Sequence, residues 1–342
     1  MSDTPHVEDE SSQITKAFHV NRLPSPRPMT KPASCPACHG EGFQTLEKID
    51  LDEQHAFYSP DKVVQKQLTE HAAVPDDSYQ MLRCNTCGLE FASPLVPPSA
   101  RWYELSYPLL DAYPGNRWEF EVVLASTHST QRLYEIGCGA GSFLKQCRSR
   151  EIAAAGTDFS ASAVAKCVDS GLSATVMDIA GAEAPQNSGG AGYDVIASFH
   201  VLEHVADPHS FFKLATSLAA DQAHLWVAVP SDRRPSRVFG ERDFLDQPPH
   251  HMTRWTESAL ASVAEPHSWS LAAIQYEPLP LRSALWWSAR RNSLYRRFVR
   301  HSNGAGVERL VRYLLYPYLL CAFHRLKRQS GLTMLAHYVK SR

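Results

Sequence analysis

The feature that most constrains this chain is an apolar segment that runs into three glycines at alternate positions. The segment begins at Leu133, and the glycines are Gly137, Gly139 and Gly141. Glycine has no side chain to keep a ligand away from the backbone, and Glu135 places a negative charge just before the turn. The Gly-x-Gly-x-Gly spacing also differs from the Gly-x-Gly-x-x-Gly of dinucleotide-binding turns. We therefore predict a strand, a tight turn and a helix that together hold a small-molecule cofactor.

The composition is that of a soluble globular protein. The chain has 342 residues, a formal net charge of −2 and 44% hydrophobic residues, and no apolar run is long enough to cross a bilayer. Its first residues lack the apolar core of a secretory signal, so we expect a cytoplasmic protein. Residues 1–34 are polar and then rich in proline and basic side chains, which predicts a disordered arm.

Two Cys-x-x-Cys pairs suggest a metal site near the start of the chain. The pairs are Cys35 with Cys38 and Cys84 with Cys87. Two intervening residues let one turn present both sulfurs to a tetrahedral ion, and a reducing cytosol favours metal over disulfides. We predict one structural zinc ion in a segment spanning 35–100; the alternative is redox-active or free thiols. The long gap between the pairs predicts an inserted element at about 46–79.

From Gln131 onward the pattern alternates strands with helices. The expected strands lie at 133–136, 152–157, 174–177, 195–199, 225–229, 271–276 and 333–339. The expected helices lie at 142–150, 160–170, 208–220 and 256–264. This order predicts an α/β fold, a doubly wound, mainly parallel seven-stranded sheet with helices on both faces. We place this core, with a lead-in helix, at 101–277, and its last strand at 333–342.

Polar residues follow the expected strands at their carboxyl ends, where open parallel sheets bind ligands. Asp158 and Phe159 follow the second strand, about 20 residues beyond the glycine turn, where a carboxylate can accept both hydroxyls of a ribose. Asp178 and Ile179 follow the third strand and could receive an exocyclic amine and cover an adenine face. Ser198 stands at the end of the fourth strand. The alternative is that these aspartates are only turn or cap residues.

Together these motifs resemble the class I S-adenosylmethionine-dependent methyltransferases over roughly 131–276, with the last strand added. The resemblance implies an enzyme that transfers a methyl group from S-adenosyl-L-methionine. It implies that the methionine part lies near the glycine turn, the ribose near Asp158 and the adenine near Asp178 and Ile179. The implied cofactor-binding set is Glu135, Gly137, Cys138, Gly139, Gly141, Asp158, Phe159, Asp178, Ile179 and Ser198.

Histidines near the expected crevice are the candidate catalytic bases. The sulfonium already activates its methyl group, so the protein must align an acceptor and, where needed, remove a proton. Histidine titrates nearest neutrality, and His250 and His251 lie in a proline-stiffened loop after the fifth strand. His200 and His204 follow the fourth strand. We take His251, His250 and His200 as the catalytic candidates; the alternative is that the adjacent pair only caps a helix or packs beneath the loop.

Two narrower resemblances concern these histidines. The cysteine pairs and the later loop are similar to those of sugar C-methyltransferases and surface-polysaccharide methyltransferases, which implies His251 or His250 as a base. The segment from His200 to His204 is similar to the Glu-x-x-Glu-His segment of quinone-pathway O-methyltransferases, with His200 in place of the first glutamate. That similarity implies a divalent metal at Glu203 and His204. The alternative is that these two residues support the turn by hydrogen bonds.

A long segment at 278–332 separates the sixth strand from the last. Between 282 and 328 it is rich in arginine, with interleaved aromatic residues and a single acidic one. We expect a helical insertion. Four roles are open for this insertion. It could form a lid packed on the sheet, contact an anionic membrane peripherally, bind a phosphorylated substrate or bind nucleic acid.

The acceptor defines two functional classes. In the first, the enzyme methylates a small-molecule or glycan acceptor, such as a sugar, a quinone-like compound or a lipid-linked glycan, with a histidine base. In the second, the zinc segment and the basic helices bind RNA or protein as the acceptor. We favour the first class because the cysteine region is not conspicuously basic, as a phosphate-binding surface should be. A non-catalytic binding module is disfavoured by the intact glycine turn and both aspartates.

Overall fold

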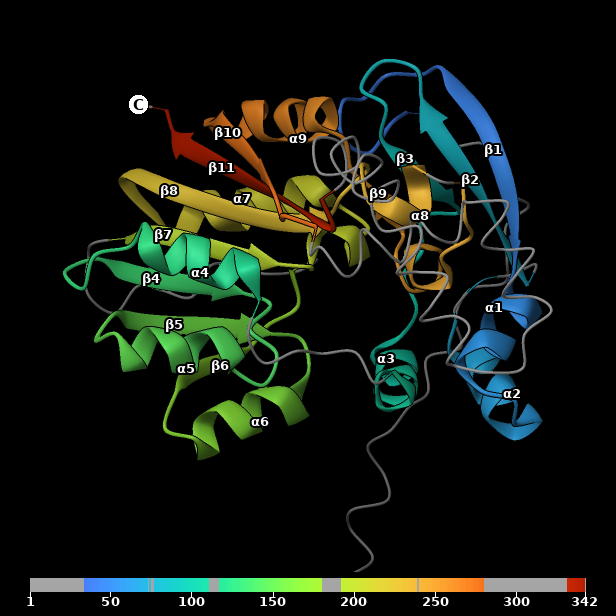
Figure 1. Cartoon of the computed structure of the whole chain (residues 1–342), viewed down its shortest axis with the longest axis horizontal. Coiled ribbons are helices and arrows are strands. Elements are labelled where there is room, and N and C mark those ends of the chain that lie inside the picture. The colour runs from blue at the N-terminus through green and yellow to red at the C-terminus, as the bar shows by residue number, and fades with distance from the viewer. Residues whose placement is uncertain are drawn as a thin grey trace, which may run out of the picture. The chain divides into compact units, whose positions relative to one another are not determined.

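The structure is a computed structural model that describes residues 34–72, 74, 77–110, 117–179, 192–238, 240–279 and 331–341. Apart from a few flanking residues, the arm expected at 1–34 and the insertion expected at 278–332 lie outside these ranges. The described part of the chain contains a seven-stranded and a four-stranded sheet (Figure 1).

The larger sheet has the strand order β10-β11-β8-β7-β4-β5-β6. Its strands are β4 (Arg132–Ile136), β5 (Ala153–Asp158), β6 (Ser173–Val176), β7 (Tyr193–Phe199), β8 (Ala219–Pro230), β10 (Trp269–Tyr276) and β11 (Thr333–Lys340). β4 pairs in parallel with β5 and β7, and β11 runs antiparallel to both β8 and β10. The predicted α/β fold with a mainly parallel seven-stranded sheet is confirmed.

Helices cover this sheet at the predicted positions. They are α4 (Trp118–Ala125), α5 (Ser142–Ser149), α6 (Ala161–Asp169), α7 (Pro208–Leu218) and α9 (Glu257–Ala264). The residues at the start of α7 show why the helix begins there. Asp207 accepts hydrogen bonds from the backbone amides of His209 and Ser210, and Pro208 fills the first turn, where its missing N–H costs nothing.

Alternate residues of each central strand point to opposite faces of the sheet. In β7, Val195 and Ala197 pack in one apolar cluster with residues of α4 and α5, whereas Ile196 packs in another with residues of α7 and α9. The period of two residues is the geometry of an extended strand. Because helices bury both faces, these strands are apolar throughout, as the sequence indicated.

The smaller sheet contains the cysteine segment. Its order is β1-β2-β3-β9, with β1 (Phe43–Asp50), β2 (Ser78–Cys84), β3 (Glu90–Ser93) and β9 (Thr253–Arg254). Between β1 and β2 the chain forms α1 (Leu51–Tyr58) and α2 (Lys62–His71), the insertion predicted between the cysteine pairs. The other helices of the described ranges are α3 (Ala100–Ser106), α8 (Pro235–Val238), η3 (Tyr107–Leu109), η5 (Leu202–His204), η6 (Phe244–Asp246) and η7 (Glu265–His267).

Strand β9 comes from the loop after β8 and joins that loop to the cysteine segment. Phe91 of β3 lies opposite Thr253, and the amide of Ala92 donates to the carbonyl of Met252 at 2.8 Å. The hydroxyl of Thr256 donates to the carbonyl of Cys87 at 2.7 Å. The loop with the two adjacent histidines is therefore anchored to the second Cys-x-x-Cys turn.

A buried carboxylate, Glu90 of β3, reinforces this junction. It accepts hydrogen bonds from Arg237 at 2.7 and 2.9 Å, and from Arg83 and Arg254 at 3.2 Å. Glu90 is 2% exposed. Burial alone would raise the pKa of Glu90, but the arginines, Arg237 foremost, lower it to about 2. The ionised carboxylate thus links β2, α8 and β9.

Replacing Glu90 tests this link. We expect Glu90→Gln to lower the free energy of unfolding by about 3 kcal/mol, because it leaves buried guanidinium groups without their anion. The depressed pKa means that this contribution is present above the usual value of 4.5 and is lost as the pH falls toward about 2. Urea unfolding at several pH values measures both effects.

Glu47 provides the matched control, because its half-exposed side chain contacts Arg254 at 3.5 Å. We expect Glu47→Gln to change stability by less than about 1 kcal/mol. Equal losses in the two variants would contradict the role given to Glu90.

Candidate active site

The glycine turn lies between β4 and α5, and its backbone conformation requires glycine. Gly137, Gly139 and Gly141 have φ angles of 82°, 50° and 78°, in the left-handed region that other residues rarely adopt. A Cβ on Gly137 would lie 2.2 Å from Cγ2 of Val201, so this glycine lets the segment after β7 approach the turn. A Cβ on Gly139 would meet nothing within 4 Å. The turn is therefore tight on one side and open on the other.

Two carboxylates flank the turn. Glu135 is 3% exposed, and its Oε2 has no hydrogen-bond partner among the described residues. Burial, with the nearby charge of Asp158, raises the pKa of Glu135 well above its usual value. Asp158 accepts the amide of Gly139 through Oδ2 at 2.8 Å and the amide of Ser160 through Oδ1 at 2.9 Å. Glu135 is thus a buried acid that would be stabilised by a cation or a donor from a ligand.

The other predicted cofactor residues lie at the same carboxyl-terminal edge of the sheet. Cys138 is buried within the turn. Phe159 is 45% exposed, and the ring of Phe159 lies 5.8 Å from the ring of Tyr103. Asp178 is exposed and Ile179 is half-buried, just beyond β6.

Ser198 differs from the rest of this set. It is fully buried, and its hydroxyl donates to the carbonyl of Ile136 at 2.9 Å, so it joins β7 to β4 inside the sheet. Its predicted contact with the cofactor would compete with this bond.

Three histidines from two distant segments converge beside this edge. His204 ends η5, the turn after β7, and His250 and His251 lie in the loop after β8. Their ring centroids are 5.3, 5.0 and 4.7 Å apart, and one nitrogen from each lies within 4.8 Å of the others. The amide of Met252 donates to the carbonyl of Glu203 at 2.8 Å, which ties the two segments together. We call His204, His250 and His251 the histidine cluster.

His251 is oriented by a carboxylate that the sequence analysis missed. Its Nδ1 lies 3.3 Å from Oδ1 of Asp246. Burial would raise the pKa of Asp246, but Arg234, His251 and Arg254 hold it far below its usual range. An ionised Asp246 can only accept, so Nδ1 of His251 is the donor and Nε2 carries the lone pair. The sequence signal was an acidic residue in the same loop, but only the fold shows that it reaches the imidazole.

The other two members of the histidine cluster are held neutral. Nδ1 of His204 donates to the carbonyl of His250 at 2.5 Å, and burial followed by the neighbouring His251 lowers the pKa of His204 to about 4. His250 is 4% exposed, and burial lowers its pKa well below the usual value. Both imidazoles are therefore uncharged at neutral pH, each with a single N–H.

Aromatic rings from the cysteine segment and from the first residues of the expected core lie around His250. The ring of Tyr58 lies at 6.2 Å, that of Trp102 at 6.0 Å and that of Tyr107 at 5.9 Å. These residues belong to α1, α3 and η3. The segment with the cysteine pairs thus helps to enclose the histidine cluster.

His200 stands apart, between two buried carboxylates. Its Nδ1 lies 3.1 Å from Glu203 Oε1, and its Nε2 lies 3.3 Å from Glu119 Oε1. Burial would lower the pKa of His200, but hydrogen bonds to Glu119 and Glu203 raise it to about 9. At neutral pH both nitrogens therefore carry protons, which argues against the predicted role of His200 as a base.

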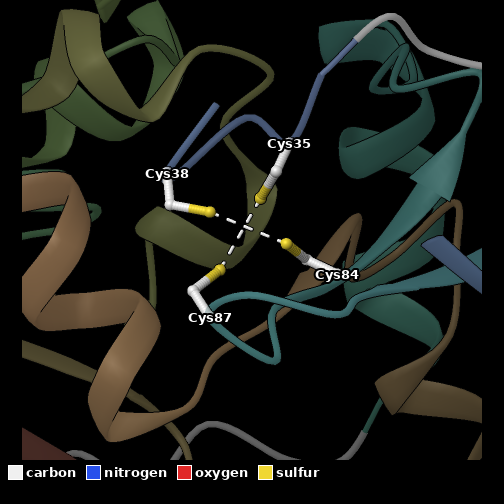
Figure 2. A group of neighbouring side chains, drawn as sticks. All are labelled: Cys35, Cys38, Cys84 and Cys87. Atoms are coloured by element: carbon white, nitrogen blue, oxygen red, sulfur yellow. Dashed lines mark hydrogen bonds between the residues drawn. The ribbon is translucent and has the colours of Figure 1, made fainter. Parts of the chain in front are cut away.

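The four cysteines of the two pairs form a compact group (Figure 2). The sulfur atoms of Cys35 and Cys87 are 3.7 Å apart, and those of Cys38 and Cys84 are 3.6 Å apart. In a tetrahedral site with Zn–S bonds of about 2.3 Å, neighbouring sulfurs lie about 3.8 Å apart. The backbone amide of Thr86 donates to the sulfur of Cys84 at 3.4 Å. The spacing of this group fits a zinc ion.

A groove of about 490 Å³ is lined in part by Asp246. Its basic lining residues are Lys48, Arg83, Arg237, Arg242 and Arg254. Its acidic lining residues are Glu47, Glu53, Glu90, Glu241, Asp243 and Asp246. Because the two signs are nearly balanced, the groove does not favour a polyanion.

Comparison with known proteins agrees with this architecture. A family model for a methyltransferase domain matches residues 115–271. No curated protein sequence matches the chain significantly. The match identifies residues 115–271 as a methyltransferase domain and confirms the prediction of a methyltransferase.

Several solved structures are similar to the chain. One is a SAM-dependent methyltransferase from Archaeoglobus fulgidus, with 16% sequence identity, a TM-score of 0.40 and coverage of 65% of this chain and 94% of that chain. Another is an S-adenosylmethionine-dependent methyltransferase from Mesorhizobium loti, with 13% identity, a TM-score of 0.42 and coverage of 65% and 97%. A third is phospholethanolamine N-methyltransferase 2 from Haemonchus contortus, with 15% identity, a TM-score of 0.42 and coverage of 67% and 54%.

Within the described ranges, no helix is both long and apolar enough to span a membrane. The basic segment at 282–328, for which peripheral membrane contact is one prediction, lies outside those ranges.

The pKa of His200 can be tested by titration. We expect its imidazole resonances to titrate near pH 9 in NMR spectra, with assignment by comparison with His200→Gln. Because the pKa is raised above the usual 6.5, the stability from its ion pairs is full below that pH and is lost as the pH rises through about 9. The variant should lack this loss. Titration of His200 near its usual value would contradict the ion-pair geometry.

Proposed function

We propose that the protein transfers a methyl group from S-adenosyl-L-methionine to a small-molecule or glycan acceptor, with a histidine after β8 as the base. The observation that carries the cofactor assignment is the buried, unpartnered Oε2 of Glu135 beside the open face of Gly139. A cationic methionine group would give this carboxylate the partner that it lacks among the described residues. The methyltransferase-domain match over 115–271 supports the same ligand.

The flanking residues fit the rest of such a cofactor. Asp158, held in place by the amides of Gly139 and Ser160, retains lone pairs for ribose hydroxyls. Phe159, Asp178 and Ile179 lie beyond β5 and β6, where an adenine would follow. When bound, the cofactor supplies an activated methyl group, and the protein has to position the acceptor and control its proton.

We assign the base to His251. Asp246 fixes its tautomer by accepting from Nδ1, which leaves the lone pair of Nε2 for the acceptor proton. Ionised Asp246 would also stabilise the imidazolium that forms. His250, with its strongly lowered pKa, is the weaker base of the adjacent pair.

The mixed charges of the groove lined by Asp246 argue against RNA as the acceptor. A nucleic-acid surface would instead carry an excess of positive charge.

Structural zinc at Cys35, Cys38, Cys84 and Cys87 completes the proposal. The ion would hold the turns before β1 and after β2 together. The carbonyl of Cys87 accepts a hydrogen bond from Thr256, just beyond the histidine loop. By fixing Cys87, zinc would therefore also help to hold this loop in place.

Cofactor binding and methyl transfer test the function directly. We expect S-adenosylmethionine to raise the unfolding temperature of the full chain, and labelled methyl to reach nucleotide sugars, glycans or quinones rather than total RNA. His251→Ala should reduce kcat by about 100-fold or more, because the proton acceptor is lost, while cofactor affinity stays unchanged.

His224 offers a control, since it is half-buried and hydrogen-bonded to His337 away from this loop. His224→Ala should retain full transfer. If the cofactor failed to stabilise the protein, the function itself would be refuted; unchanged turnover in His251→Ala would refute only the base.

Zinc content tests the cysteine site. We expect Cys84→Ser to lose about one equivalent of bound zinc per chain and to unfold at a lower temperature, because three ligands hold the ion less tightly. Cys147, which is fully buried in α5, is the matched control, and Cys147→Ser should keep its zinc. Equal zinc in both variants, measured by mass spectrometry of the metal, would contradict the assignment.

A further inference from the structure

We infer that the histidine cluster, His204, His250 and His251, is a second metal site, which takes a divalent transition-metal ion of the zinc, cobalt or nickel class. One nitrogen of each residue lies within 4.8 Å of the other two. Ligands on one ion with metal–nitrogen bonds of about 2.1 Å lie about 3.4 Å apart, so binding would require the rings to rotate until their nitrogens are closer together. Imidazole ligands select these metals over magnesium or calcium.

Two unpartnered atoms point to a missing cation. Nδ1 of His250 is buried and has no hydrogen-bond partner in the described part of the chain. The same is true of Oε2 of Glu203, whose Oε1 lies 3.8 Å from Nε2 of His251. A buried nitrogen lone pair and a buried carboxylate oxygen each cost free energy unless a donor or a metal ion satisfies them. A cation in the cluster would satisfy the nitrogen directly and would attract the carboxylate.

The surrounding hydrogen bonds hold two of the rings in the tautomer that a metal ligand needs. Nδ1 of His251 bonds to Asp246, and Nδ1 of His204 donates to the carbonyl of His250. In metal sites the ligating histidine commonly donates its other N–H to a carboxylate or carbonyl in this way. Both rings therefore direct an Nε2 lone pair away from these bonds.

Three protein ligands leave one tetrahedral position for water or an acceptor oxygen. A bound ion would take the Nε2 lone pair of His251, so His251 serves as the base only in protein without this ion. With the ion bound, the pKa of a coordinated acceptor hydroxyl would be lowered. The inference rests on the geometry of the cluster and stands independently of the proposed acceptor and of cofactor binding.

Cobalt binding tests the site separately from the cysteines. Full-length protein produced with zinc is dialysed against Co²⁺, and bound metal is measured together with the visible spectrum. We expect about one equivalent of Co²⁺ with the weak bands of nitrogen and oxygen ligands and without thiolate charge-transfer bands. His204→Gln should weaken this binding by at least about 10-fold, while the zinc content of the cysteine site is unchanged.

His224→Gln is the matched control, because His224 is also half-buried and hydrogen-bonded to a second histidine. It should bind Co²⁺ like the wild type. His251→Gln provides a second test if His204→Gln fails to fold, as judged by circular dichroism. The inference is overturned if wild-type protein retains no Co²⁺, if its Co²⁺ spectrum shows thiolate ligation only, or if the folded histidine variants bind as the wild type does.

Discussion

The active site depends on the contact of one side chain, Arg254, with two buried carboxylates. Its Nη1 lies 3.2 Å from Oε2 of Glu90, and its Nε lies 3.4 Å from Oδ2 of Asp246. Glu90 belongs to the strand that follows the second cysteine pair, and Asp246 orients His251. The same guanidinium therefore sets the position of the cysteine segment and of the histidine loop. Both carboxylates stay ionised although they are buried, because arginines surround them: Arg237 foremost at Glu90 and Arg234 foremost at Asp246, with Arg254 shared by the two.

Burial and neighbouring charge separate the protonation states of histidines that lie close together. His200, between Glu119 and Glu203, has its pKa raised to about 9, whereas His204 has its pKa lowered to about 4. At neutral pH one short turn thus carries a protonated imidazole and a neutral one.

Much of the core could be predicted because its signals are local. The apolar runs of the strands, the glycines of the first turn and the Asp207-Pro208 start of α7 act through the backbone of neighbouring residues. The partners of the histidines could not be predicted in this way. Glu119 and Asp246 reach His200 and His251 only after the sheet has folded, and neither carries a local mark of that role.

By itself, the sequence determined the α/β sheet, the glycine turn and the two Cys-x-x-Cys turns, because strand burial and turn geometry depend on short-range pattern. Only the tertiary structure decided that β9 joins the cysteine sheet, that His204 meets His250 and His251, and that two buried carboxylates flank His200. These outcomes depend on which distant side chains share a buried, low-dielectric space. The free energy of a buried charge is set by all of its neighbours at once, and a linear pattern does not contain that information.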